Sequence, residues 1–409
     1  MKKSVVSFFL AVLLSVSLLG VAYAETQTTE SKIISFTDIS GHWAESQINS
    51  AVAAGYVSGY PDGTFKPDQE VSRAEFTKML TTALGLKSVS GASGAWYQEA
   101  VNAATEAGIY ADDFKTGTWD TKMPRKEMML LSVRAGITGY KQDYDINRNL
   151  YEGARAGLIM GTSPGNIDPD GTTTRAQAVV VIERVLAVKR GETLPSDKYA
   201  VGAAEILWHR TNILTMLPQY FGNPTQESAN EYSEFKDDLM RSVSDNGKIA
   251  CSVNRLVVVD LDDPNDPNRA LVTSDDFRWY NAKDSFKLKE ASGGYAVFYI
   301  VDISLDKDHG ASYVTPCRAT VYNSEWHESP LNATDTKNLN RDYSFFPWDS
   351  KYEEFMLGIR TGTESGKVTY TAGQLIPKQH KVSNKEFVVK FSGIGKNEGV
   401  KQIYSSTLK

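Results

Sequence analysis

The sequence predicts a multidomain chain, in which an all-α, three-repeat N-terminal region is followed by a mostly-β, sandwich-like region. Two observations carry this prediction. Before residue 190, a glycine, a turn-rich loop and an arginine at a helix start recur three times, about fifty residues apart. After residue 244 the pattern changes to short runs rich in Val, Tyr, Phe and Thr, which turn residues separate.

Residues 1–24 have the features of a signal peptide. A basic start precedes the apolar run 5–19, and small residues follow at 22–24, as at a signal-peptidase cleavage site. The apolar run is too short to favour a permanent span, so we expect a secreted protein with no membrane segment after cleavage. Cleavage changes the formal net charge from −6 to −8, because two lysines are lost. Nucleic-acid binding is not expected, since it requires a basic surface.

The repeats share one order of features. Each has a run compatible with a helix, then a glycine, then a loop rich in Pro, Gly and Asp, and then the start of a second helix. The glycines are Gly55, Gly108 and Gly157, and the arginines that follow them by 17 or 18 residues are Arg73, Arg125 and Arg175. In the first repeat Ser72 and Glu75 form a capping box, which predicts a helix start at this point.

A physical reason connects the loop, the helix start and the arginine. One helix pair cannot bury its apolar faces alone, so neighbouring repeats must share a core. A helix N-terminus carries unpaired N–H donors and partial positive charge. The arginine adds a planar charged group that suits a carboxylate. We therefore expect each loop and helix start to form an anion receptor.

The repeats resemble the S-layer homology family. The stretch FTDISGHWAESQINSAVAAGYVSGYPDGTFKPDQEVSRAEFTKML, residues 36–80, is similar to that family almost end to end. We expect repeats at 34–87, 91–140 and 141–190, which cover less than half of the chain. The resemblance implies that the three repeats fold into a pseudo-threefold unit with grooves between adjacent repeats. It also implies anchoring at the cell wall.

In this family the grooves bind a secondary cell-wall polysaccharide, whose pyruvate ketal supplies a carboxylate. The resemblance implies that an arginine, a tryptophan and a glycine contact this glycan. The matching residues are Arg73, Trp43 and Gly59 in the first repeat, Arg125 and Trp96 in the second, and Arg175 and Gly161 in the third. Asp112 and Asp145 stand where the second glycine and the third tryptophan would be, and an acidic side chain should weaken the binding of a carboxylate.

Two consequences follow for these residues. Grooves that draw on the first repeat are expected to bind best, so Arg73→Ala should weaken binding more than Arg175→Ala. A structural role remains open as well. Each arginine could pair with a carboxylate of the helical bundle, and Trp43 and Trp96 could be core residues.

The second half begins with a polar linker, 191–198. Residues 199–243 are expected to form a helical connector, and 244–409 to form the β-rich region. The apolar segment 199–221 of the connector fits a buried helix or strand pieces, and Pro218 is expected to end it. Cys251 and Cys317 lie in strand-like runs of an exported chain, which indicates one disulfide, although two buried thiols would fit as well.

We identify no family resemblance after residue 195, so two classes of function remain open. The β-rich region is either a binding or structural module for an unknown outer-surface partner, or a wall-anchored glycan hydrolase. Hydrolysis requires two carboxylates at a defined separation; the candidates are Asp275, Asp276, Asp302, Asp306 and Glu325. Their spacing does not single out a pair, so we predict a surface protein that is not an enzyme. The histidines are scattered, and no metal or cofactor is expected.

Overall fold

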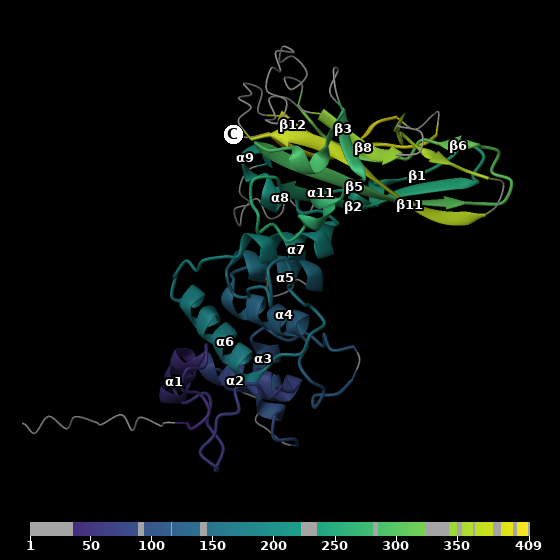
Figure 1. Ribbon diagram of the computed structural model, residues 1–409. Helices are drawn as coiled ribbons and strands as arrows, with labels where there is room; N and C mark the ends of the chain where they lie inside the picture. The colour runs from purple at the N-terminus through teal and green to yellow at the C-terminus, as the bar shows by residue number, and fades with distance from the viewer. Residues whose placement is uncertain are drawn as a thin grey trace, which may run out of the picture. The chain divides into compact units, whose positions relative to one another are not determined.

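The computed structural model describes residues 36–88, 94–115, 117–139, 145–221, 235–280, 285–323, 343–349, 354–362, 365–378, 386–395 and 399–407. The predicted signal peptide lies outside these residues. Helices come first along the chain and antiparallel strands follow (Figure 1), which confirms the coarse prediction of fold class. Among the described residues, no helix is long and apolar enough to cross a bilayer.

Each predicted repeat contains two helices. They are α1 (Glu45–Ala53) and α2 (Arg73–Ala83), α3 (Gln98–Glu106) and α4 (Arg125–Gly136), and α5 (Ile146–Arg155) and α6 (Arg175–Lys189). The second helix of each repeat begins at the arginine that the sequence marks as its first turn. Ser72 and Thr174 cap α2 and α6 with complete capping boxes, so local sequence explains where these helices start.

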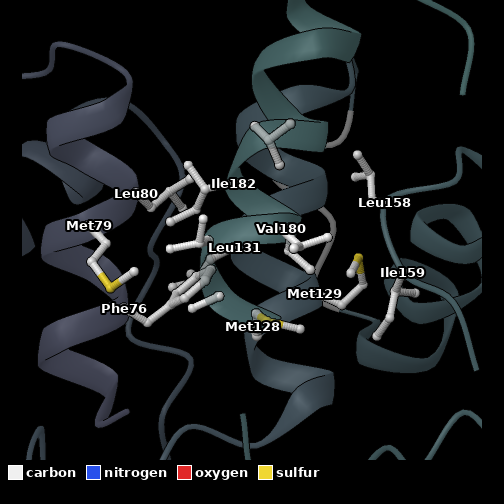
Figure 2. Packing of buried hydrophobic residues seen from close by; sticks show 14 of the residues in the cluster. Phe76, Met79, Leu80, Met128, Met129, Leu131, Leu158, Ile159, Val180 and Ile182 are labelled. Atoms are coloured by element: carbon white, nitrogen blue, oxygen red, sulfur yellow. The ribbon is translucent and has the colours of Figure 1, made fainter. Parts of the chain in front are cut away.

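One apolar core joins the helices of all three repeats. Phe76 and Leu80 on α2, Leu131 on α4 and Ile182 on α6 are fully buried in it (Figure 2). Burial of a Leu, Ile or Phe side chain contributes about 1.5–3 kcal/mol. The helical pairs therefore depend on one another for their stability, as the repeat pattern predicts.

A closed ring of backbone hydrogen bonds lies where the three second helices begin. The N–H of Val71 donates to the carbonyl of Thr173, that of Thr173 to Met123, and that of Met123 to Val71, each over 2.9 Å. All three residues are fully buried. Each one both donates and accepts, so every repeat is held by the other two. The pseudo-threefold arrangement that the resemblance implies remains a prediction.

The helix α7 (Lys198–His209) belongs to this core, because Ala200, Val201 and Ala204 pack into the same apolar cluster. The rest of the expected connector differs from the prediction. Its apolar helix breaks at Arg210, which takes a left-handed φ of 60°, and two short helices follow, α8 (Ile213–Met216) and α9 (Pro218–Phe221).

Pro218 begins a helix instead of ending one. This is physically reasonable, because the first helical position needs no N–H donor. Residues 241–243, also expected in the connector, pair with the sheet as β1.

One carboxyl group is fully enclosed between α7 and α8. Glu205 accepts hydrogen bonds from the N–H groups of Leu214, at 2.9 Å, and Thr215, at 2.8 Å. Burial raises the pKa of Glu205 to about 8, although the hydrogen bonds act in the opposite direction. The folded protein therefore holds a proton on this group at a pH where the unfolded chain has lost it.

In the described residues of the β-rich part, the strands form one large sheet and two small ones, and the strand pairs of these sheets are antiparallel. The large sheet has the order β1-β2-β5-β11-β8-β3-β4, with β9 against β8. Its strands are β1 (Arg241–Val243), β2 (Ile249–Asp260), β3 (Phe277–Tyr280), β4 (Ser285–Lys287), β5 (Gly294–Leu305), β8 (Tyr343–Asp349), β9 (Glu354–Phe355) and β11 (Gly366–Pro377). The smaller sheets contain β7 (Arg318–Tyr322), β12 (Glu386–Ser392) and β13 (Lys401–Thr407), and β6 (Tyr313–Val314) with β10 (Ile359–Arg360). Short helical turns are η1 (Asp237–Leu239), α11 (Ala270–Thr273) and η2 (Leu288–Glu290).

Apolar side chains cover both faces of the large sheet. Val253 and Val301 on its central strands pack in one cluster with Val389 of the three-stranded sheet. On the other face, Phe298 and Phe345 pack around Trp279. A face-to-face contact between two antiparallel sheets is the arrangement of a sandwich.

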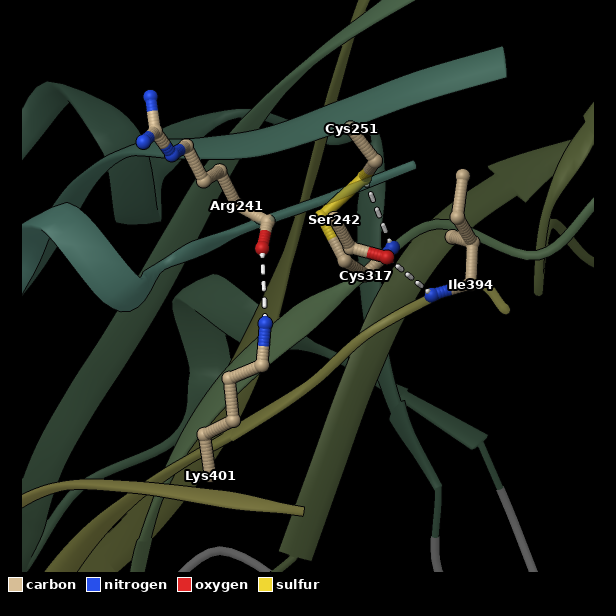
Figure 3. The surroundings of a disulfide bond; sticks show 6 residues. All are labelled: Arg241, Ser242, Cys251, Cys317, Ile394 and Lys401. Atoms are coloured by element: carbon tan, nitrogen blue, oxygen red, sulfur yellow. Dashed lines mark hydrogen bonds between the residues drawn. A yellow bond between two sulfur atoms is a disulfide. The ribbon is translucent and has the colours of Figure 1, made fainter. Parts of the chain in front are cut away.

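The two cysteines are bonded, as the sequence indicates. Cys251 on β2 joins Cys317, which directly precedes β7, with the Cα atoms 6.1 Å apart (Figure 3). Nearby, the N–H of Ile394 donates to the Ser242 hydroxyl at 2.9 Å. The disulfide therefore ties the large sheet to the three-stranded sheet.

Removal of the disulfide should destabilise the β-rich part. We expect Cys251→Ala combined with Cys317→Ala to lower the free energy of unfolding by roughly 4 kcal/mol, because the bond restricts a long loop of the unfolded chain. Denaturant unfolding with and without reductant measures this loss. Free thiols in the native protein, detected by mass spectrometry, would contradict the pairing.

The enclosed carboxyl group predicts a pH dependence. The pKa of Glu205 rises from 4.5 to about 8 on folding, so its contribution to stability is complete below the lower value and is lost as the pH rises through the higher one. Wild type should therefore lose unfolding free energy between these values relative to Glu205→Gln. Denaturant unfolding of both proteins across this range makes the comparison, and parallel curves would exclude the proton on Glu205.

Candidate functional site

Two grooves of the same construction lie on the helical part. Groove 1 has a volume of about 310 Å³ and groove 3 of about 320 Å³, which is the size of small ligand sites. Groove 1 is lined by Gly55, Tyr56, Val57, Ser58, Glu75, Lys78, Met79, Thr82, Trp96 and Arg175. Groove 3 is lined by Trp43, Arg125, Ile159, Met160, Gly161, Thr162, Gln177, Val180, Val181 and Arg184.

Each groove combines residues from all three predicted repeats. One repeat provides the loop and its second helix, the next provides a tryptophan, and the remaining one provides an arginine. Groove 1 thus joins the first loop to Trp96 and Arg175, and groove 3 joins the third loop to Trp43 and Arg125. The structure therefore combines a tryptophan and an arginine from different repeats in each groove, and not from the same repeat.

Both tryptophans lie at the surface. Trp43 is 62% exposed and Trp96 is 56% exposed, so neither is a core residue and that alternative is excluded. In groove 1, Nζ of Lys78 lies 5.2 Å from the centre of the Trp96 ring, within the range of a cation–π contact. Large exposed aromatic groups beside a hollow are typical of binding surfaces.

The groove arginines are held by neutral groups. Arg175 donates from Nε to the Phe65 carbonyl and from Nη2 to the Ser58 carbonyl, both over 2.9 Å. Arg125 donates in the same way to the carbonyls of Ile167, at 3.1 Å, and Met160, at 3.0 Å. Carbonyl partners fix a guanidinium without cancelling its charge. Neither arginine forms an ion pair with any residue that the structure describes.

Arg73 is held differently. It forms two hydrogen bonds to the Glu127 carboxylate, from Nε over 2.7 Å and from Nη2 over 2.6 Å. Its guanidinium also lies 4.6 Å from the centre of the Phe114 ring. A bidentate pair of this kind is among the strongest polar contacts in proteins, so an acidic side chain already compensates the charge of Arg73.

The expected part of the helix N–H groups in an anion receptor is wrong, because protein carbonyls already accept hydrogen bonds from the first two N–H groups of each second helix. Those of Arg73 and Ala74 donate to the carbonyls of Thr121 and Trp119 in the next repeat. The other two helices repeat the pattern: Arg125 and Lys126 donate to Gly171 and Pro169, and Arg175 and Ala176 donate to Gln69 and Pro67. The positive groups of the grooves are therefore side chains and not helix termini.

The loop glycines have a steric role. A Cβ atom on Gly59 would lie 2.8 Å from the Thr64 carbonyl oxygen, and one on Gly161 would lie 2.7 Å from that of Ser163. Asp112 occupies the same place in the second loop with a left-handed φ of 55°. Gly161 lines groove 3, whereas Gly59 shapes the loop of groove 1 without lining it.

Asp145, at the third tryptophan position, caps α5. Its carboxylate accepts hydrogen bonds from the N–H groups of Asn147 and Arg148, at 3.0 and 3.1 Å. Its neighbour Tyr144 lies outside the described residues.

Sequence reasoning missed a second cation in each groove. Lys78 is exposed in groove 1, and Arg184 is half-buried in groove 3. Burial lowers the pKa of Arg184, and this side chain makes no hydrogen bond or ion pair with the described residues. Alignment of the repeats would have revealed the position, because Arg184 follows Arg175 by the same interval as Arg134 follows Arg125.

Comparison with known proteins agrees with this geometry. The S-layer homology domain family matches residues 35–77 and 146–179. This chain carries S-layer homology domains. They place the protein at the cell wall or cell surface. The second predicted repeat lies outside the two matches, but it takes part in the hydrogen-bond ring and contributes Trp96 and Arg125 to the grooves.

Several relatives share part of the chain. An amylopullulanase of Thermoanaerobacterium thermosulfurigenes is 32% identical over 174 residues, which are 37% of this chain and 9% of that enzyme. An S-layer protein of Bacillus licheniformis is 29% identical over 169 residues, 36% of this chain and 19% of that protein. A cellulosome-anchoring protein of Acetivibrio thermocellus is 44% identical over 55 residues, 13% of this chain and 12% of the other. The chain thus spans less than a fifth of the length of these relatives.

The exposed tryptophans should contribute little to folding. We expect Trp43→Ala and Trp96→Ala to change the free energy of unfolding by less than about 0.5 kcal/mol, because these side chains face solvent. Phe76→Ala, at a fully buried position, is the matched control and should cost about 3–5 kcal/mol. Urea unfolding measures all three, and a loss above about 2 kcal/mol for either tryptophan would indicate a structural role.

Proposed function

We propose that grooves 1 and 3 bind a pyruvylated secondary cell-wall polysaccharide and thereby anchor the protein to the wall without a covalent bond. One observation supports this most strongly: each groove places an exposed tryptophan near an arginine that has no acidic partner among the described residues. A guanidinium that forms no ion pair with a described residue, in a groove that also holds an aromatic side chain, suits a sugar that carries a carboxylate. Asp168 attracts Arg125 without forming an ion pair with it.

The chemistry of recognition follows from the side chains. The carboxylate of a pyruvate ketal accepts hydrogen bonds from Arg125 or Arg175, and the sugar ring packs against Trp43 or Trp96. A hydrogen bond to a charged group contributes roughly 1.5–3 kcal/mol. The backbone bonds that hold each arginine fix the guanidinium before the ligand arrives, so less conformational entropy is lost on binding.

We also propose that the helical part is a pseudo-threefold unit. Equivalent residues of the three repeats form the central hydrogen-bond ring, and the first N–H groups of each second helix donate to the next repeat in cyclic order. Both grooves take their parts from the repeats in the same cyclic order: the loop and second helix from one repeat, the tryptophan from the next and the arginine from the remaining one. This regularity supports a pseudo-threefold arrangement of the repeats.

For the β-rich part we propose a binding or structural module. Three of its candidate carboxylates are engaged by other groups. Lys289 and Lys287 hold the pKa of Asp275 down at about 2. Asp302 accepts hydrogen bonds from Asn254 and Thr369. Ser274 donates to Asp276, Asp306 accepts no side-chain bond from a described residue, and Glu325 lies outside those residues. A general acid for glycan hydrolysis requires a raised pKa.

A cavity of about 530 Å³ beside the disulfide, with both charged and apolar side chains in its lining, offers a place for the unknown partner. Its charged lining includes Asp238, Arg241, Asp302 and Lys401. The alternative, a glycan hydrolase, predicts the release of reducing ends. Incubation of the full chain with peptidoglycan and common polysaccharides would reveal that activity, and a positive result would replace our proposal for this part.

The anchoring function is tested with a double variant. Arg125→Ala combined with Arg175→Ala should abolish sedimentation of the full chain with purified cell walls, because each groove loses its carboxylate contact. Arg125→Lys combined with Arg175→Lys should restore only part of the binding, since an ammonium cannot copy the planar fork.

Arg190→Ala is the control, because this exposed arginine at the end of α6 lines neither groove and, among the described residues, forms an ion pair with Glu192. Its binding should equal that of wild type. Walls stripped of pyruvate should bind all variants equally weakly. Full binding by the double alanine variant, or undiminished binding of wild type to stripped walls, would contradict the proposal.

A further inference from the structure

The construction of grooves 1 and 3 implies a third set of residues, which we call groove 2. By the same cyclic rule it combines the second loop, α4, the start of the third repeat and Arg73. The structure shows that the positive positions of this set are already occupied. Arg73 is bound by Glu127, and Arg134 is bound by Asp113 over 2.6 and 3.0 Å. Asp145 stands in place of the tryptophan.

A single proline explains why Glu127 is available to Arg73. In the first repeat, Glu75 lies three residues after the cap Ser72 and accepts the N–H of that residue at 2.7 Å. In the third, Gln177 accepts the N–H of Thr174 at 3.2 Å. These polar side chains are therefore engaged in capping boxes on their own helices.

In the second repeat the cap is Pro124, which has neither an N–H to donate nor a side-chain acceptor. Glu127 occupies the position that Glu75 and Gln177 hold elsewhere, but no capping box can form around it. Its carboxylate instead reaches the guanidinium of Arg73 from the neighbouring repeat. The exchange of a cap residue thus converts a local capping group into an ion-pair partner between repeats.

We propose that Glu127 is a built-in carboxylate that takes the place of the ligand at Arg73, so that groove 2 is closed to glycan and the chain has two binding sites. This inference rests on the proposed function of grooves 1 and 3. It assigns Arg73 and Glu127 to the joint between the first two repeats, and it assigns glycan recognition to Arg125 and Arg175.

The energetics favour the closed state. The side chain of Arg73 is 3% exposed and that of Glu127 is 13% exposed, so the pair is largely removed from water. A ligand carboxylate that displaced Glu127 would leave a poorly hydrated, unpaired charge behind. Removal of one partner from a buried ion pair lowers the folding equilibrium constant by roughly a hundredfold or more. A ligand carboxylate at Arg73 would only replace the contact that Glu127 already makes, so it would gain no additional attraction.

Calorimetric titration of the full chain with a methyl hexopyranoside that carries a 4,6-pyruvate ketal tests the proposal. Wild type should bind two molecules per chain. Arg73→Ala should also bind two, with the affinity of wild type, whereas Arg125→Ala and Arg175→Ala should each bind one. Thermal unfolding shows which variants are folded, and we expect Arg73→Ala to lower the melting temperature most.

Two variants should open groove 2. Glu127→Gln removes the competing charge, and Pro124→Ser restores a cap that can draw Glu127 back to its own helix. Each should add a third, weaker binding event, weaker because groove 2 lacks a tryptophan. Glu192→Gln, an exposed carboxylate that pairs with Arg190 and lines neither groove 1 nor groove 3, is the control and should leave two sites.

The outcomes separate the two levels of the proposal. Absence of binding by wild type would overturn the proposed function and this inference with it. Two sites in wild type that persist unchanged in both Glu127→Gln and Pro124→Ser would leave anchoring intact but overturn the role of Glu127. Three sites in wild type, or a lost site in folded Arg73→Ala, would show that groove 2 is open.

Discussion

The helical part depends on the hydrogen-bond ring of Val71, Met123 and Thr173. Because each of these residues gives its N–H to one repeat and its carbonyl to another, the three segments cannot be placed independently. The ring sets where the second helices begin, and it thereby sets where Arg73, Arg125 and Arg175 enter the neighbouring repeats. The same geometry satisfies the first N–H groups of each helix, which buried helix ends require.

Within this frame, the partners of each arginine decide its role. The three arginines occupy equivalent positions at the starts of α2, α4 and α6. Two of the guanidinium groups donate to carbonyls and one donates to a carboxylate. A carbonyl orients the group and leaves its charge available, whereas a carboxylate compensates it. Burial does not separate the cases, because Arg73 and Arg125 are 3% and 4% exposed. An ion pair to a carboxylate therefore distinguishes Arg73 from Arg125 and Arg175.

The β-rich part is held by different means. Long central strands pack against a smaller sheet, and the Cys251–Cys317 bond joins the two. A disulfide of this kind suits a protein at the cell surface, where the surroundings are oxidising. The charged side chains of Asp238, Arg241, Asp302 and Lys401 line the cavity near this bond.

The sequence by itself determined the repeats, the helix starts and the change to strands, because these depend on local patterns and on composition. It left the pairing of the two cysteines open, and the structure shows the disulfide. Capping boxes at Ser72 and Thr174 are readable from four residues. The tertiary structure alone decided which arginine faces which loop. Sequence similarity ranked Arg73 first, but its partner Glu127 belongs to the next repeat, 54 residues away. Such a contact is invisible to motif matching, because it depends on how repeats assemble and on the missing cap at Pro124.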